Sequence, residues 1–148
     1  MEDKTNVNLI IVNESKEGPY TREVIIGEHR LTGDESVDNG GNDSGPSPYD
    51  FLLTALGTCT SMTVRTYAKL KQIPLKNIIV RLSHQKIHAD DCVNCEEKNA
   101  KIDKIEVGLE LQGDLTSEQM DKLLEIANMC PVYRTLTSKI LINTQLVN

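Results

Sequence analysis

The sequence is poor in the side chains that bind nucleic acids. It contains no tryptophan, one phenylalanine and four tyrosines, so few rings are present that can stack on bases. Its 16 lysines and arginines are outnumbered by 22 aspartates and glutamates, which gives a formal net charge of −6 at pH 7. No cluster of basic residues interrupts this acidic balance, whereas a protein that grips a phosphate backbone needs one. We therefore expect no nucleic-acid partner.

Long apolar runs are also missing. No segment reaches the roughly 18 consecutive apolar residues of a membrane span, and the start MEDKTN lacks the basic and apolar regions of a secretory signal. These absences predict a cytoplasmic protein with no membrane partner. Stable disulfides are rare in a reducing cytosol, so we expect the cysteines to be free thiols, metal ligands or redox groups. They are Cys59, Cys92, Cys95 and Cys130.

The length of 148 residues and the hydrophobic content of 39% predict a single domain, residues 1–148, whose core needs no disulfide framework. Runs of β-forming residues bounded by turn residues predict strands, and apolar residues at helical spacing predict helices. The expected strands cover residues 7–12, 20–26, 29–32, 78–88 and 104–111, with a last strand that has Ile140, Ile142 and Leu146 on one face. The expected helices cover residues 47–71 and 116–130, and after Pro131 a further helical turn or two covers residues 132–137.

The first long helix begins with recognisable capping chemistry. Ser47 can cap, Pro48 suits the first helical position, and Asp50 completes a capping box three residues after the cap. Residues 51–62 are apolar or small almost all round, so this helix is expected to be buried on several sides. Gly57 predicts a close packing contact with another helix or with a second copy of the same helix. Because few aromatic residues are available to cover this helix, we expect a homodimer.

The residues alone leave the roles of two cysteines open. Cys59 lies about three turns inside the first helix, where a buried core thiol is the simpler interpretation. Cys130 is either the last core position of the second helix or, if a new helix starts at Pro131, the cap of that helix. At a cap, unpaired N–H groups would favour a thiolate.

Two segments make the chain recognisable. Residues 45–62 read GPSPYDFLLTALGTCTSM, and residues 130–136 read CPVYRTL. Together with the paired strands before the first segment and the strand-helix order after it, they resemble the OsmC/Ohr family of osmotically inducible proteins C and organic hydroperoxide resistance proteins. The resemblance implies an α+β fold in which antiparallel sheets surround two long central helices of an interlocked homodimer, with the sites at the dimer interface.

The resemblance also implies a thiol peroxidase that requires no cofactor. Cys59 would be the thiolate that attacks the O–O bond of a hydroperoxide and becomes a sulfenic acid. Cys130 would be the thiol that condenses with it to a disulfide. A dithiol reductant would then restore both thiols.

Two positions differ from the pattern of the characterised peroxidases. Those enzymes carry Glu directly after the proline of the helix start, whereas here Tyr49 takes that place and the carboxylate follows at Asp50, as a catalytic group or only a cap. They also hold the thiolate and the peroxide with an Arg from the opening turn. Here that turn offers Lys16, and the nearest arginines are Arg22 and Arg30. The chain therefore resembles the broad OsmC-like branch more than either well-described enzyme.

A separate candidate site lies at the end of the expected strand 78–88. His88, Cys92 and Cys95 have a spacing compatible with three ligands that converge on Zn²⁺, with His84, Asp90, water or a partner chain as the fourth. The alternatives are a polar loop without metal and, since a single Cys-x-x-Cys is present, a redox pair.

Two hypotheses about function follow. The first is an OsmC-like peroxidase that reduces organic or inorganic hydroperoxides through Cys59 and Cys130 in oxidative-stress defence. The alternative is a non-catalytic OsmC-like protein that binds a small electrophile, a lipid or a metal at the dimer interface. Formation of a Cys59–Cys130 disulfide with an organic hydroperoxide would distinguish the two.

Overall fold

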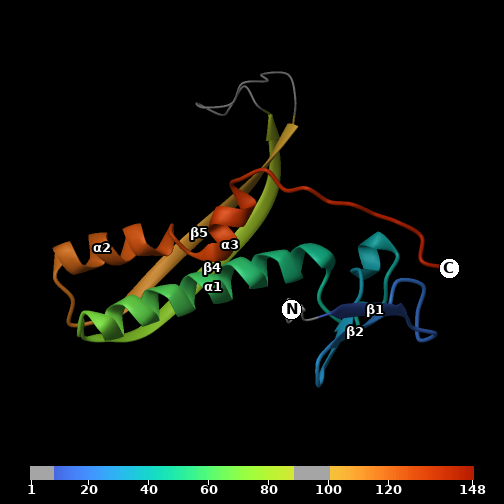
Figure 1. Cartoon of the computed structure of the whole chain (residues 1–148), viewed down its shortest axis with the longest axis horizontal. Coiled ribbons are helices and arrows are strands. Elements are labelled where there is room, and N and C mark those ends of the chain that lie inside the picture. The colour runs from blue at the N-terminus through green and yellow to red at the C-terminus, as the bar shows by residue number, and fades with distance from the viewer. Residues whose placement is uncertain (1–8, 89–100) are drawn as a thin grey trace, which may run out of the picture. The chain divides into compact units, whose positions relative to one another are not determined.

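A computed structural model describes residues 9–88 and 101–148 of the chain (Figure 1). The chain divides into two compact units, Met1–Leu52 and Leu53–Asn148. The first unit holds β1 (Ile10–Glu14), β2 (Arg22–Ile26), β3 (His29–Gly33), the short 3-10 helix η1 (Val37–Asn39) and the start of α1 (Pro48–Leu70). The second holds the rest of α1, β4 (Leu75–His88), β5 (Lys101–Gly113), α2 (Ser117–Ala127) and α3 (Pro131–Leu136). Helices combined with antiparallel sheets confirm the predicted α+β class.

The first unit is built on a three-stranded antiparallel sheet in the order β1-β2-β3. The register aligns Val12 with Val24 and Val24 with Leu31, so these three side chains share one face. Gly27, in the tight turn between β2 and β3, has a φ of 57°, a left-handed conformation that glycine adopts without steric cost. The opening strands predicted from the sequence are therefore confirmed.

The connection from β3 to α1 is organised around the buried carboxylate of Asp34. Its Oδ2 accepts the Ser44 hydroxyl at 2.5 Å, the Ser44 backbone N–H at 3.2 Å and the Thr21 hydroxyl at 3.2 Å. Its Oδ1 accepts the Glu35 backbone N–H at 2.7 Å. These bonds lower the pKa of Asp34 from 3.8 to about 2, and the bond from the Ser44 hydroxyl is the largest cause.

Asp34→Asn is expected to remove a pH-dependent part of the stability of this unit. Because the carboxyl has the lower pKa in the folded chain, its contribution is complete above about pH 3.8 and is lost as the pH falls towards 2. Within this window the wild-type chain should take up as much as about one more proton on unfolding than the variant does. Urea titrations at a series of pH values measure the difference, and equal pH slopes for the two chains would contradict it.

The start of α1 has the capping chemistry that the sequence predicts. Ser47 Oγ accepts the Asp50 backbone N–H at 3.3 Å, and Asp50 Oδ2 accepts the Ser47 backbone N–H at 2.9 Å. Pro48 occupies the first helical position, where its missing N–H costs no hydrogen bond. α1 then continues for 23 residues, which at 1.5 Å per residue is about 35 Å. Among the described helices, none combines the length and the hydrophobicity of a membrane span.

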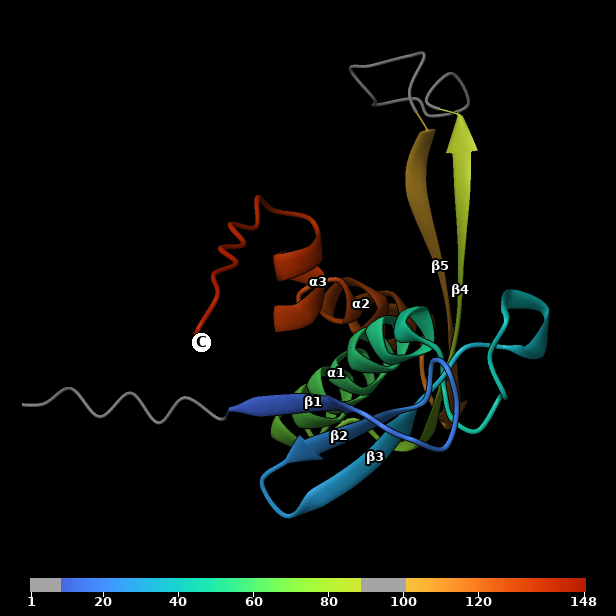
Figure 2. The same cartoon turned by 90° about the vertical axis from the view of Figure 1, so that its right-hand side faces the viewer.

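In the second unit, β4 and β5 form a long antiparallel hairpin, and the helices lie against one face of it (Figures 1 and 2). The core lies where α1 and α2 meet this hairpin. Its buried members are Val64 and Ala68 of α1, Leu75 of β4, and Leu123 and Ala127 of α2. Ile78, Leu109 and Leu111, which are partly buried, extend the core along the two strands.

α2 and α3 are separated by a break at Cys130. Thr116 and Gln119 form the predicted capping box at the start of α2. This helix ends at Ala127, and Pro131 opens α3 with Cys130 as its N-cap. The sequence left open whether Cys130 is the last core position of one helix or the cap of the next. The structure places it at the cap of α3, where it is fully buried.

Gly57 makes the close contact that the sequence predicts, but its neighbour is a strand. A Cβ atom at this position would lie 2.7 Å from Leu82 Cδ1 of β4. The expectation of another helix of the same chain at this point is therefore wrong, and contact with a second copy of α1 stays a prediction. Within the described residues α1 is the one helix of this length, since α2 has 11 residues, so a second long central helix is not part of this unit.

The expected last strand is also wrong. Residues 139–148 have no regular secondary structure, and Ile140, Ile142 and Leu146 are exposed. Alternating apolar side chains make a strand only where a neighbouring strand supplies hydrogen bonds. In the part of the chain that the structure describes, no strand pairs with this segment.

Candidate functional site

Cys130 is held between α1 and the start of α3. Its exposed fraction is 0%. Its Sγ accepts the backbone N–H of Tyr133 at 3.3 Å, as an N-cap side chain does. The hydroxyl of Thr60, on α1, lies 3.6 Å from the same sulfur. The sulfur therefore has both a backbone N–H and a hydroxyl within contact distance.

Cys59 directly precedes Thr60 on α1 and is partly buried. Consecutive residues of an α-helix have Cα atoms about 3.8 Å apart and point about 100° apart. The contact between Thr60 and Cys130 therefore brings Cys130 against the turn of α1 that carries Cys59. Both cysteines are free thiols. The structure brings the two sequence segments together, and the catalytic roles of their thiols stay predictions.

A cavity of about 310 Å³ adjoins this pair of segments. It is lined by residues of α1, β5 and α3 and by the C-cap of α3, most of them apolar: Leu56, Asp103, Ile105, Val107, Tyr133, Leu136 and Thr137. Two of these residues also take part in the contacts of the cysteine site. The C=O of Leu56 accepts the Thr60 hydroxyl at 2.8 Å, and the N–H of Tyr133 is the one bonded to Cys130. A molecule in the cavity would therefore lie close to the two segments.

The acidic residue of this cavity, Asp103, is held by two side chains of β4. His84 Nε2 lies 2.8 Å from Asp103 Oδ1, and Lys86 Nζ lies 3.4 Å from the same oxygen. The hydrogen bond with His84 is the largest cause that lowers the pKa of Asp103. The sequence pattern gave no sign of this cluster, because it depends on the strand register that pairs Lys86 with Asp103.

The other candidates for activating Cys59 make local contacts in the first unit. Asp50 closes the capping box of α1. Arg22 Nη2 lies 3.4 Å from Glu14 Oε1, and Arg30 donates to two backbone carbonyls of its own turn region. Lys16 is exposed in the turn before β2. A catalytic role for Asp50, or for any of the three basic residues, stays a prediction.

The predicted zinc ligands fall only partly within the described residues. His88 is exposed at the end of β4, whereas Cys92 and Cys95 lie outside the residues that the structure describes, as does Asp90. Within residues 9–88 and 101–148, no group of three or more His, Cys, Asp or Glu side chains is arranged to hold a metal ion. The zinc site therefore stays a prediction.

Sequence reasoning missed Thr60, the residue that joins the two segments. No signal singled it out, because Thr54, Thr58, Ser61, Thr63 and Thr66 carry hydroxyls in the same helix. Its local partner, the C=O of Leu56, follows from the helix, but its contact with Cys130 depends on the packing of α3 against α1.

Comparison with known proteins agrees with this fold. In solved structures, the chain is similar to an OsmC-like protein from Mycoplasma pneumoniae, with 18% identity and a TM-score of 0.68 over 99% of this chain and 100% of that one. It is also similar to the organic hydroperoxide resistance protein OsmC of Legionella pneumophila, with 14% identity and a TM-score of 0.63 over 88% of each chain. The organic hydroperoxide resistance protein OhrB of Bacillus subtilis gives 12% identity and a TM-score of 0.60 over 88% of this chain and 90% of that one.

At these identities the likeness establishes the fold alone. No curated protein is significantly similar to the chain in sequence. The profile of a protein family described as OsmC-like protein, however, matches residues 40–145, which include both cysteine segments and most of the chain. The chain therefore belongs to the OsmC-like protein family.

Proposed function

We propose that the protein is a thiol peroxidase that reduces organic hydroperoxides and so contributes to defence against oxidative stress. The Cys59 thiolate attacks one oxygen of the O–O bond, the bond breaks, and the substrate leaves as an alcohol after it takes up a proton. The Cys130 thiolate then attacks the sulfur of the Cys59 sulfenic acid. The S–O bond breaks, and hydroxide leaves as water with the proton that Cys130 released. A dithiol reductant supplies two electrons and two protons to restore both thiols.

The observation that carries this proposal is the position of Cys130 against the turn of α1 that carries Cys59. A sulfenic acid that forms on Cys59 would lie on the residue next to Thr60, the side chain that Cys130 contacts. The Tyr133 N–H and the Thr60 hydroxyl are placed to donate to a thiolate at Cys130, which is the attacking form. Two of the similar proteins are named for organic hydroperoxide resistance, which supports the same substrate class.

The adjoining cavity favours an organic substrate. Its volume of about 310 Å³ lies in the range of cavities that hold small organic molecules. Apolar walls such as Leu56 and Ile105 stabilise a hydrocarbon group by removing it from water. Hydrogen peroxide gains nothing from these walls, so we expect slower consumption of hydrogen peroxide than of cumene hydroperoxide.

Treatment of the reduced chain with one equivalent of cumene hydroperoxide tests the proposal. We expect a disulfide between Cys59 and Cys130, identified by peptide mass mapping, and full recovery of both thiols after addition of dithiothreitol. A chain that stays reduced, or that forms a disulfide between other cysteines, rejects the mechanism.

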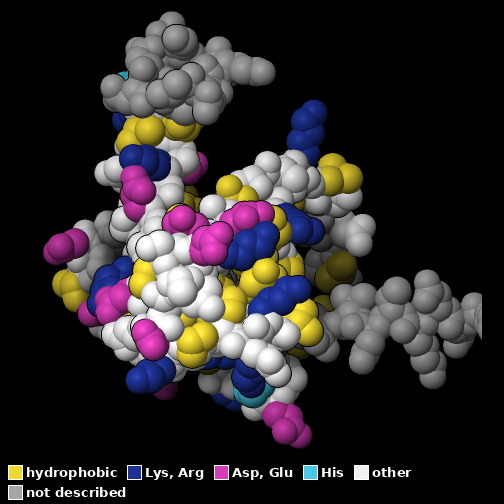
Figure 3. All heavy atoms as spheres, turned by 90° about the vertical axis from the view of Figure 1, so that its left-hand side faces the viewer, with side chains coloured by type: hydrophobic (Ala, Val, Ile, Leu, Met, Phe, Trp, Pro, Cys, Tyr) yellow, Lys and Arg dark blue, Asp and Glu magenta, His cyan; other side chains and the backbone are white. Residues whose placement is uncertain are grey.

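We infer that the active assembly is a homodimer. Large apolar side chains are exposed on α1 and along residues 139–148, among them Met62, Leu70, Leu141, Ile142, Leu146 and Val147. Figure 3 shows hydrophobic side chains that reach the surface among acidic and basic ones. Apolar surface of this extent is typical of a protein that has a partner, and a second copy of the chain is the simplest one.

Sedimentation velocity at micromolar concentration is expected to give a species of about twice the chain mass of 16.5 kDa. Met62→Glu should weaken the dimer by about tenfold or more, because it places a charge on an apolar contact surface. Glu118→Lys, a charge change at an exposed position of α2, serves as the control. A folded wild-type monomer at this concentration would contradict the inference.

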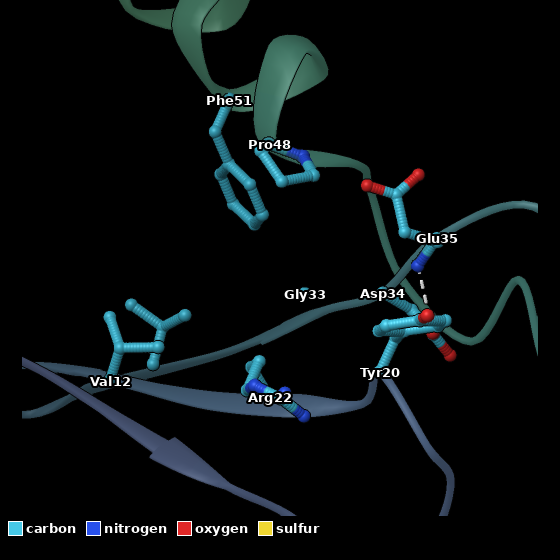
Figure 4. Close-up of a pocket in the computed structure, with 9 residues that line it drawn as sticks. Val12, Tyr20, Arg22, Gly33, Asp34, Glu35, Pro48 and Phe51 are labelled. Carbon is cyan, nitrogen blue, oxygen red and sulfur yellow. Dashed lines mark hydrogen bonds between the residues drawn. The ribbon is translucent and has the colours of Figure 1, made fainter. Parts of the chain in front are cut away.

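A second candidate function, binding without turnover, is favoured by a different cavity within the first unit. This cavity of about 320 Å³ lies between the three-stranded sheet and the first turn of α1. Val12 and Arg22 of the sheet lie across from Pro48 and Phe51 (Figure 4). The lining joins these apolar side chains to the guanidinium of Arg22 and to the acidic residues Asp34 and Glu35, so it suits a small apolar molecule without a negative charge.

The neutral alcohol 1-octanol is a suitable probe for this second function. Binding of 1-octanol that Val12→Trp abolishes, in a preparation that does not consume hydroperoxide, would favour binding over catalysis. Hydroperoxide turnover without 1-octanol binding would exclude it.

A further inference from the structure

Thr60 is a buried residue of α1 whose hydroxyl has two neighbours. Its exposed fraction is 2%. The hydroxyl oxygen lies 2.8 Å from the C=O of Leu56, one turn earlier in the helix, and 3.6 Å from Cys130 Sγ. A hydroxyl has one proton to donate and two lone pairs that accept. It therefore donates to one neighbour at a time, and it can accept only from the thiol of Cys130, because a C=O has no proton to donate.

The protonation state of Cys130 decides which neighbour receives the proton of Thr60. A thiol can donate its S–H to Thr60 Oγ1 while the hydroxyl donates to Leu56. A thiolate has no proton, so the hydroxyl turns towards the sulfur and makes a charge-assisted hydrogen bond. The C=O of Leu56 keeps the backbone N–H of residue 60, its regular partner in an α-helix, so the rotation leaves no acceptor unsatisfied.

We propose that Thr60 is a positioning residue for the step that closes the disulfide. It holds Cys130 against α1 and donates a hydrogen bond to the thiolate that attacks Cys59. This inference rests on the proposed function. In the step, the S–S bond forms, the S–O bond of the sulfenic acid breaks, and hydroxide leaves as water with the proton that Cys130 released.

Burial makes the hydroxyl hard to replace. Because the sulfur of Cys130 has an exposed fraction of 0%, bulk water does not reach it to supply the missing donor. The backbone N–H of Tyr133 remains in any Thr60 variant, so the thiolate would keep one donor of the two. A buried anion that loses a donor is disfavoured, and disulfide closure slows accordingly.

The same helix supplies a matched control. The hydroxyl of Thr66 donates to the C=O of Met62 at 2.8 Å, which repeats the local hydrogen bond of Thr60, but Thr66 is exposed. Val has the branched shape of Thr without the hydroxyl, so Thr60→Val and Thr66→Val make the same change at the two positions. Thr60→Ser keeps the hydroxyl and loses only a methyl group.

Single-turnover kinetics with one equivalent of cumene hydroperoxide test the inference. Dimedone trapping at a series of times measures the lifetime of the Cys59 sulfenic acid, and mass mapping follows the disulfide. At about pH 7, Thr60→Val is expected to prolong this lifetime about tenfold, Thr60→Ser by less than about threefold, and Thr66→Val not measurably. The rate of the first oxidation of Cys59 should be unchanged in all three.

Rescue by the conservative variant separates hydrogen-bond donation from support of the fold. If the hydroxyl donates to the sulfur, Thr60→Ser keeps the lifetime of the sulfenic acid close to that of the wild-type chain, whereas Thr60→Val does not. Equal defects in Thr60→Ser and Thr60→Val, or no defect in Thr60→Val, overturn the inference. Should Thr60→Val not fold, Thr60→Ala removes the same hydroxyl and is judged by the same two results. A wild-type chain that oxidises without a Cys59–Cys130 disulfide overturns the proposed mechanism itself.

Discussion

Replacing Cys59 with serine is expected to lower the rate of hydroperoxide consumption by about a thousandfold or more. A serine hydroxyl is not ionised at neutral pH and is a far weaker nucleophile than a thiolate, so the first step has no attacking group. The two side chains are similar in size, and Cys59 is only partly buried, so α1 should keep its packing. The loss of cumene hydroperoxide measures the rate, and circular dichroism verifies the fold.

The remaining cysteines provide the control for this prediction. A chain with both Cys92→Ser and Cys95→Ser should consume hydroperoxide at the wild-type rate, because the proposed mechanism uses neither thiol. If this double variant loses its activity while Cys59→Ser retains it, the reactive thiol lies outside α1 and the assignment of Cys59 is wrong.

The helix starts were predictable from the sequence because their chemistry is local. Ser47 and Asp50 stand three residues apart, as do Thr116 and Gln119, and each pair closes a capping box within its own turn. Pro131 acts locally as well, since its missing N–H ends a helix and favours the start of a new one. These signals do not depend on what the rest of the chain does.

Contacts between distant segments were not predictable in the same way. The close neighbour of Gly57 is Leu82, and the sulfur of Cys130 meets Thr60, and both contacts depend on how α1 packs against later segments. The segment around Ile140 was mispredicted for a related reason. Its alternating pattern describes a strand, but a period of two cannot say whether a neighbouring strand is available.

The residues of the candidate site also fall into two groups, those that the sequence supplied and those that only the fold revealed. The resemblance of two short segments supplied Cys59 and Cys130, because those segments carry the residues in a recognisable order. The hydrogen-bond donors around the second sulfur, Thr60 and the Tyr133 N–H, required the fold. The contacts of His84 and Lys86 with Asp103 required the register of β4 and β5.

Cys130→Ser is expected to leave the first oxidation of Cys59 unchanged within about twofold and to abolish the disulfide between them. Serine is a good N-cap residue and can accept the Tyr133 N–H as the sulfur does, so α3 keeps its start and the variant tests the thiol rather than the fold. Without the second thiol, the sulfenic acid persists until excess hydroperoxide converts it to sulfinic and sulfonic acids.

Mass spectrometry of the intact chain follows this outcome. The variant should gain about 16, 32 and 48 Da in turn as oxygen atoms add to Cys59, whereas the wild-type chain should lose two hydrogens as the disulfide closes. Dithiothreitol should restore the wild-type chain fully but should not rescue the variant after the second oxygen has added, because sulfinic acid is not reduced by thiols. A variant that resists this over-oxidation as well as the wild-type chain does would show that another group resolves Cys59, and that the contact between α1 and Cys130 serves packing alone.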